Sequence, residues 1–177
     1  MVVYHCNTNS ILIEPFQTRK DRHRIPAYTR IMTRLKTQGH IINHQVLENE
    51  ASKEYRRLVT DIWTSTYQLV PPDVHWRNIT KRAIRTFKAH FLSILAGIPP
   101  SFPNYLWDKL LPQTKLSLNL LLQSTIALLL SAWEAFNVPF NFDATPLGPI
   151  GCQVLIHNKP STCASSALPY YTTDVSK

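Results

Sequence analysis

The residues best suited to chemistry form a basic cluster between positions 81 and 88. Lys81, Arg85 and Lys88 follow one another at intervals of four and three residues, and Arg82 lies beside them. On a helix this spacing places the side chains on one face. Several cations at one end of a helix suit the phosphates of a nucleic acid, which are contacted without reading base sequence. The pattern predicts weak, salt-sensitive binding of DNA or RNA, with an ordinary solvated helix face as the alternative.

Histidine and cysteine, which commonly ligate metals or act as nucleophiles, form no comparable cluster. The three cysteines include no CxxC pair, so the sequence predicts neither a disulfide framework nor a zinc site. His40 and His44 lack an accompanying cysteine pair and are interpreted as ordinary polar histidines. His5 and Cys6 are neighbours in an expected strand, where adjacent side chains point to opposite faces, which argues against a nucleophile pair. No metal site is assigned.

Charge is distributed unevenly along the chain. The 177 residues carry a formal net charge of +8, with 44% hydrophobic and 17% charged residues, which indicates one domain with a hydrophobic core and excludes wholesale disorder. Residues 1 to 90 hold fifteen Lys and Arg against seven Asp and Glu, whereas residues 91 to 177 hold four of each. The whole excess therefore belongs to the half that contains the basic cluster. A nucleic-acid partner fits this asymmetry, as does a merely soluble surface.

The elements that must position these residues alternate between strands and helices. The expected elements, in order, are a hairpin of Val2–Tyr4 and Ile11–Ile13, an amphipathic helix from near Pro26 to Gly39, a strand over Ile41–Leu47, a helix from Ala51 to Ile62, a strand over Thr66–Val70, a helix from Asn78 to Gly97, and a helical stretch from Tyr105 that Pro112 kinks or divides. This alternation predicts an α/β domain with a mixed sheet over residues 1–135. Residues 136–177 form a Pro-rich extension with one expected strand, Gln153–His157, and a disordered end.

Three short segments carry a more specific pattern. They are Leu47-Glu48-Asn49-Glu50-Ala51-Ser52, Tyr67-Gln68-Leu69-Val70-Pro71-Pro72, and Asn78-Ile79-Thr80-Lys81-Arg82-Ala83-Ile84-Arg85-Thr86-Phe87. In order and spacing they resemble the integrase core of LTR-retrotransposon polyproteins, and similarity continues at Leu106–Gln113 and Ala144–Gly151. The resemblance implies a ribonuclease H-like fold, in which helices flank a mixed sheet. It also implies DNA integration by metal-dependent polynucleotidyl transfer, with nucleic acid and a second copy of the chain as partners.

The same resemblance implies three metal-binding acids, and this chain departs from all three. The first-strand Asp should lie near His5, the second Asp corresponds to Glu48, and the helix Glu corresponds to Lys81. The family's chemistry uses two magnesium or manganese ions, held by oxygen ligands, to activate the attacking oxygen and stabilise the leaving one. A cation at position 81 repels both metals. We therefore expect no metal cofactor and an inactive relative, a pseudoenzyme, which also lacks the zinc module that usually precedes the family's core.

Eighteen uncharged, Leu-rich residues, Leu116 to Trp133, raise the alternative of a membrane-associated fragment. Their number matches a membrane span, but polar residues interrupt the run and no basic cluster follows it, which favours a buried helix. The extra leucines of this run also predict exposed hydrophobic surface and aggregation. Because residues Met1–His5 resemble a strand more than a secretory signal, an intracellular protein, nuclear or cytoplasmic, is expected.

Overall fold

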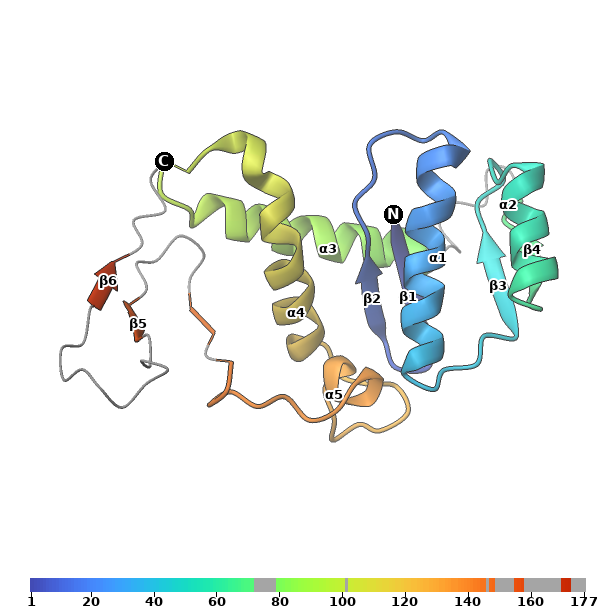
Figure 1. Cartoon of the computed structure of the whole chain (residues 1–177). Helices are drawn as coiled ribbons and strands as arrows, with labels where there is room; N and C mark the ends of the chain where they lie inside the picture. The colour runs from blue at the N-terminus through green and yellow to red at the C-terminus, as the bar shows by residue number, and fades with distance from the viewer. Residues whose placement is uncertain (72–78, 101, 146, 149–154, 158–169, 173–177) are drawn as a thin grey trace, which may run out of the picture.

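The chain folds as a mixed α/β protein in the computed structural model, which describes residues 1–71, 79–100, 102–145, 147–148, 155–157 and 170–172 (Figure 1). The strands are β1 (Val2–His5), β2 (Ser10–Ile13), β3 (His44–Leu47), β4 (Thr66–Leu69), β5 (Leu155–His157) and β6 (Tyr170–Thr172). The helices are α1 (Asp21–Thr37), α2 (Lys53–Arg57), the π-helical η1 (Leu58–Ile62), α3 (Ile79–Ala96), the 3-10 helix η3 (Asn104–Leu110), α4 (Leu111–Leu121) and α5 (Ala132–Phe136). The alternation of strands and helices expected from the sequence is confirmed.

The described strands form separate two-stranded sheets, where the sequence predicted one mixed sheet. β1 and β2 are antiparallel, β3 and β4 are parallel, and β5 and β6 are antiparallel. In Figure 1 the arrows of β2 and β3 point the same way. Because β1 is antiparallel to β2, β1 and β3 run in opposite directions.

The β1–β2 hairpin is covered by helices on both faces. On one face Val3 and Leu12 belong to the cluster built on the buried side of α1. On the other face Ile11 and Ile13 belong to a second cluster, which includes Phe87 of α3 and residues of α4. Successive strand residues point to opposite faces, so a strand covered on both faces is buried throughout. All four residues of β2 are buried accordingly.

Helix α1 begins earlier than its sequence suggested. Its start was expected near Pro26, but the helix begins at Asp21 and Pro26 lies inside it. Asp21 forms a salt bridge of 2.5 Å with Arg24, and an acid in the first turn is also favourable to the helix dipole. The apolar face is buried as expected, by Tyr28, Ile31, Met32 and Leu35. The helix ends before Gly39, whose φ of +78° suits glycine.

Three other boundaries differ from expectation or decide between alternatives. β3 begins at His44, later than the expected Ile41, and the second helix changes from α to π geometry at Leu58. Pro112 divides a 3-10 helix from α4, where it stands near the N-terminus and needs no hydrogen-bond acceptor for a missing N–H. β5 falls within the expected Gln153–His157 strand. The expected cap Asn78 and most of the chain beyond residue 148 lie outside the described residues.

The Leu-rich run is not one buried helix, contrary to the favoured expectation. Helix α4 ends at Leu121, a loop follows, and α5 begins only at Ala132. Within the loop Leu129 is 99% exposed, and Ile126 and Leu128 are each 67% exposed. Thus the run does present exposed hydrophobic surface. Among the described helices none has the length and apolar character needed to cross a membrane.

Candidate nucleic-acid interface

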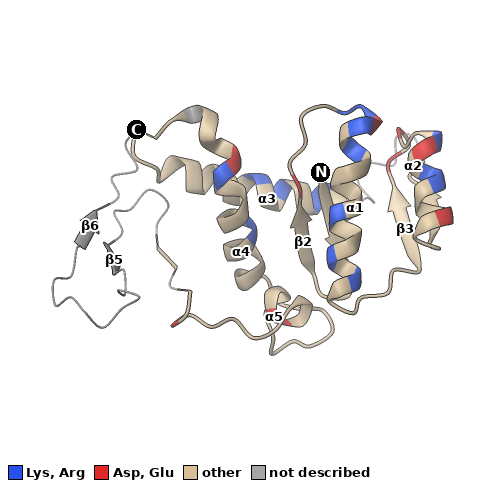
Figure 2. Ribbon diagram, viewed as in Figure 1, with Lys and Arg blue, Asp and Glu red and all other residues tan. Residues whose placement is uncertain are grey.

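Helix α3 presents the basic cluster on its outer face. Ala83 and Phe87 are its buried residues, and they anchor the opposite face. Arg82, Arg85 and Lys88 are all exposed, while Lys81 is half-buried. Basic segments follow the first half of the helix in Figure 2. The spacing of the cations thus produces the common face that the sequence predicted.

Little opposes the charge of this face. The first turn of α3 contains no acidic residue, and no salt bridge in the described part of the chain involves Arg82, Arg85 or Lys88. The field of Arg82 reaches the hairpin: burial raises the pKa of Tyr4, and the Arg82 guanidinium partly offsets this rise. Three exposed cations that form no ion pair within the described ranges can therefore interact with an external polyanion.

Contacts with α4 hold α3 in place. The His90 imidazole Nε2 and the Ser117 hydroxyl are 2.8 Å apart, and burial lowers the pKa of His90. Within α3 the rings of Phe87 and Phe91 are stacked with centroids 5.8 Å apart, and both residues pack in the cluster that contains Leu111 and Leu118 of α4. These contacts lie on the side of α3 opposite the basic cluster. Packing therefore fixes the position of the helix while its cations face outward.

His5 belongs to a buried hydrogen-bond chain. Its Nδ1 is 2.8 Å from the Thr8 hydroxyl, which donates to the Ser10 hydroxyl over 2.8 Å. Ser10 in turn donates to the carbonyl of Ala132 over 2.9 Å. Because the only proton of the Thr8 hydroxyl is used toward Ser10, the proton between Thr8 and His5 must come from Nδ1. The neutral Nδ1–H tautomer is therefore the form of His5 that fits this chain.

Aromatic rings surround the other side of His5. Its ring centroid lies 4.8 Å from that of His40 and 6.1 Å from that of Phe136, and His40 stacks on Phe136 at 4.8 Å. Burial, and secondarily the neighbouring His40, lowers the pKa of His5 to about 4. His5 is thus a neutral residue that joins the hairpin to the end of α1 and to α5. Residue type and spacing gave no signal of this cluster, because its members come from three distant segments.

The fold separates two of the three positions matched to the family's acids. His5 ends β1 and Glu48 directly follows β3, so the opposite directions of these strands place the two residues at opposite ends of the sheet region (Figure 1). Lys81 lies in the first turn of α3. A hydrogen-bonded histidine, an exposed carboxylate and a cation do not fit a magnesium or manganese centre. Among the described residues no group of three or more His, Cys, Asp or Glu is placed to hold a metal ion.

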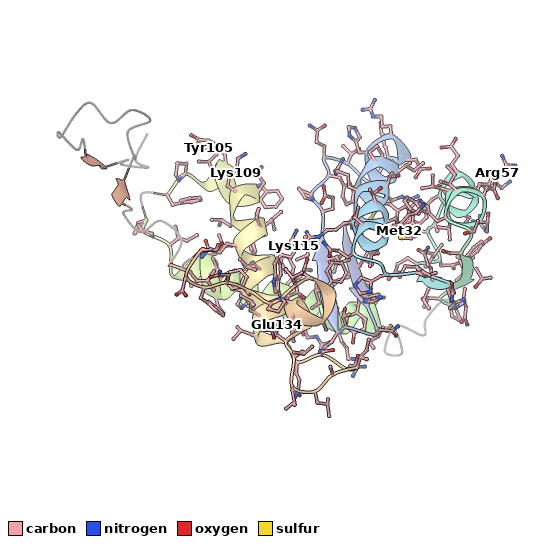
Figure 3. All side chains as sticks on the ribbon, turned by 60° about the horizontal axis from the view of Figure 1, so that its bottom comes forward. Met32, Arg57, Tyr105, Lys109, Lys115 and Glu134 are labelled. Atoms are coloured by element: carbon pink, nitrogen blue, oxygen red, sulfur yellow. The ribbon has the colours of Figure 1, made fainter. Side chains whose placement is uncertain are left out.

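A cavity of about 520 Å³ lies between β1 and β3. Residues 1–7 form one wall, residues 41–48 form the other, and the buried side of α1 contributes Tyr28, Met32 and Leu35. Figure 3 labels Met32 on α1. The sequence did not predict this cavity, since it depends on how the two strand pairs are placed relative to each other.

Of the predicted site residues, the basic cluster alone is assembled on the surface as the sequence indicated. His5 and Glu48 lie at opposite ends of the sheet region, and the His5 cluster and the cavity emerge only from the fold. No protein-family model, no curated protein and no solved structure matches this chain.

Proposed function

We propose that this chain derives from the integrase core of an LTR retrotransposon and acts, without catalysis, as a weak nucleic-acid-binding protein. The observation that carries the binding function is the exposed trio Arg82, Arg85 and Lys88, which has no ion-pair partner among the described residues. The family origin is supported by the order and spacing of the sequence segments around Glu48, Tyr67 and Lys81. The ribonuclease H-like arrangement belongs to the same proposal.

Binding through this face should be electrostatic and indifferent to sequence. The cations reach phosphate oxygens, while no feature of the face selects a base. Each phosphate contact contributes about −0.9 to the slope of log K against log salt concentration. Three contacts give a slope of about −3, so affinity for duplex DNA should fall roughly 50-fold between 50 and 200 mM salt.

The test is a titration of a fluorescein-labelled 20-base-pair duplex, followed by anisotropy at 50, 100 and 200 mM NaCl. The variant Arg82→Ala/Arg85→Ala/Lys88→Ala should lose at least tenfold in affinity at 50 mM and most of its salt dependence. The matched control removes the same charge from exposed positions elsewhere, by Lys36→Ala/Lys53→Ala/Arg57→Ala. It should lose much less affinity. Equal losses in the two variants would assign binding to net charge alone and overturn the proposed interface.

Catalysis is tested separately by a strand-transfer assay with magnesium and with manganese. No product is expected, since the donor set at His5, Glu48 and Lys81 does not fit a two-metal site. Any product that disappears on chelation would contradict the assignment of the chain as inactive.

A further inference from the structure

Two strand edges face each other across the cavity between β1 and β3. Among the described residues β1 is paired only with β2, and β3 only with β4. Both strands nevertheless line the same cavity. Each strand therefore has one edge toward its partner and one edge toward the cavity. The main-chain groups on these inner edges determine what the cavity can accept.

The hydrogen bonds of the hairpin identify the groups on the edge of β1. Ile11 of β2 directs its N–H and C=O away from β1, because both bond to the side chain of Asn119. Residues opposite each other in an antiparallel pair share this orientation, so Tyr4, the partner of Ile11, directs its groups away from β2. Val2 does the same by the two-residue period. Two residues of β1 thus present main-chain donors and acceptors on the cavity side.

The edge of β3 follows from the same reasoning. The carbonyls of Asn43 and Leu47 accept from the N–H groups of Thr66 and Val70, so these carbonyls point toward β4. Main-chain groups alternate along a strand. Therefore His44 and Val46 direct their N–H and C=O toward the cavity.

The size and cover of the cavity suit one strand. Four extended residues at the spacings of a sheet occupy a block of roughly 600 Å³, about 13 Å long, 4.8 Å wide and 10 Å thick. This is close to the cavity volume of about 520 Å³. Helix α1 lines one side, and Ile79 and Thr80 at the start of α3 also reach the cavity. A strand covered on both faces is apolar at successive positions.

Two polar side chains that line the cavity each have one nitrogen without a hydrogen-bond partner among the described residues. The Nε2 atom of Gln45 and the Nε atom of Arg24 are buried and have no hydrogen-bond partner in the described part of the protein. Both residues line the cavity. Because both atoms are shielded from solvent, they lie behind the cavity surface, and the strand edges supply the hydrogen-bonding groups of the cavity.

We infer that the cavity binds an extended, apolar segment of another polypeptide, which adds a strand between β1 and β3. The segment hydrogen-bonds to Val2 and Tyr4 on one side and to His44 and Val46 on the other. Binding by strand addition derives affinity from main-chain hydrogen bonds and selectivity from the side chains that enter the flanking pockets. This inference does not depend on the nucleic-acid interface, which uses the outer face of α3.

The first test uses a synthetic peptide on the full chain. The probe is a fluorescein-labelled peptide, Lys-Lys-Thr-Val-Ile-Val-Thr-Lys-Lys, whose lysines limit non-specific attraction to the basic protein. The control peptide has the same side chains but N-methyl groups on alternate amides, which remove the donors on one edge. We expect saturable binding of the probe and at least tenfold weaker binding of the control. Equal binding of the two peptides, or binding of neither, overturns the inference.

Hydrogen exchange gives a second readout that a simple gain in stability would not produce. With the probe bound, the amides of Val2, Tyr4, His44 and Val46 should exchange at least tenfold more slowly, and those of Val3 and Gln45 should change less. Slowing without this alternation contradicts strand addition. If the four amides are already protected because the protein forms a stable dimer, a second copy of the chain occupies the cavity. That result also overturns the inference.

Variants at one position separate the main-chain effect from the side-chain effect. Val46→Pro removes the N–H that faces the cavity, whereas Val46→Thr keeps it together with a branched side chain. Val46→Pro should weaken probe binding at least tenfold, and Val46→Thr less than threefold. The reverse order would show that the side chain, and not the strand edge, binds the peptide.

Discussion

The two edges of the β1–β2 hairpin differ in how their main-chain groups are hydrogen-bonded. Along β2 the Asn119 side chain accepts from the N–H of Ile11 over 2.8 Å and donates to its C=O over 2.9 Å. Ser10 adds a bond to the carbonyl of Ala132. Along β1 the corresponding main-chain groups face a cavity. A single buried amide on a helix can thus close a strand edge, whereas an edge without such a residue stays available for another strand.

Removing the Asn119 side chain that bonds to the outer edge of β2 should have the largest effect on stability. Asn119→Leu leaves the N–H and C=O of Ile11 buried without partners, which costs about 4 kcal/mol, since each such group typically costs about 1–3 kcal/mol. Urea unfolding followed by circular dichroism measures this loss. Asn49→Leu, at an exposed position, is the matched control and should change the free energy of unfolding by less than about 0.5 kcal/mol. A similar loss in both variants would remove the distinction between the two edges.

Proline substitutions compare the two sides of β3 directly. Gln45→Pro removes an N–H on the side that faces β4, while Val46→Pro removes one that faces the cavity. The first should cost about 2–3 kcal/mol, because the ladder loses a bond and the Tyr28 hydroxyl loses the Gln45 side chain that accepts from it. The second should cost less than half as much. Equal costs in urea unfolding would show that the inner edge of β3 is already bonded.

The pH dependence of the free energy of unfolding should report on the buried hydrogen-bond chain that begins at His5. The pKa of His5 is lowered to about 4 in the folded protein from its usual 6.5. As the pH falls from 6.5 toward 4, His5 therefore becomes protonated in the unfolded chain but stays neutral in the folded one. The free energy of unfolding decreases as a result. We expect a loss of roughly 2 kcal/mol between pH 7 and pH 4.5.

His5→Asn is the appropriate comparison, because its side-chain amide can donate to Thr8 without titrating. Its stability should fall less steeply with decreasing pH over the same range. Parallel curves for the two proteins would mean that His5 is protonated equally in the folded and unfolded states.

The smallest predicted effect concerns the start of α5. Ser131 accepts from the N–H of Glu134, and the Glu134 carboxylate accepts from the N–H of Ser131, which completes a capping box. The Ser131 contacts also lower the pKa of Glu134. Ser131→Ala should cost about 1 kcal/mol. Because Ala132 receives the bond from Ser10, the variant should also raise hydrogen exchange along β2 more than along β3.

Local patterns predicted local structure well. The amphipathic pattern before Gly39 located α1, the short runs Val2–Tyr4 and Ile11–Ile13 located the hairpin, and the cations of α3 located its outer face. These features depend on residues close in sequence. The start of α1 was misplaced because proline is typical of the first turn of a helix, which indicated a start near Pro26. Asp21 also favours a helix N-terminus, and the helix begins there.

Features that depend on distant contacts were not predictable. Leu116–Trp133 has the composition of a buried helix, yet the chain leaves helical geometry after Leu121 and forms the Gln123–Ser131 bridge. Nothing near Asn119 indicates that it closes an edge more than a hundred residues away. The cavity likewise follows from the placement of two strand pairs, which no local pattern encodes.

The opposite directions of β1 and β3 also limit what reversion by substitution can achieve. His5→Asp, Glu48→Asp and Lys81→Glu each introduce a residue typical of the family. The first two nevertheless place their carboxylates at the two far ends of the sheet region, so these two carboxylates cannot bind the same pair of ions. Restoring the residue types of a metal site and restoring its geometry are therefore separate problems here, because the directions of the strands set the distance between positions 5 and 48.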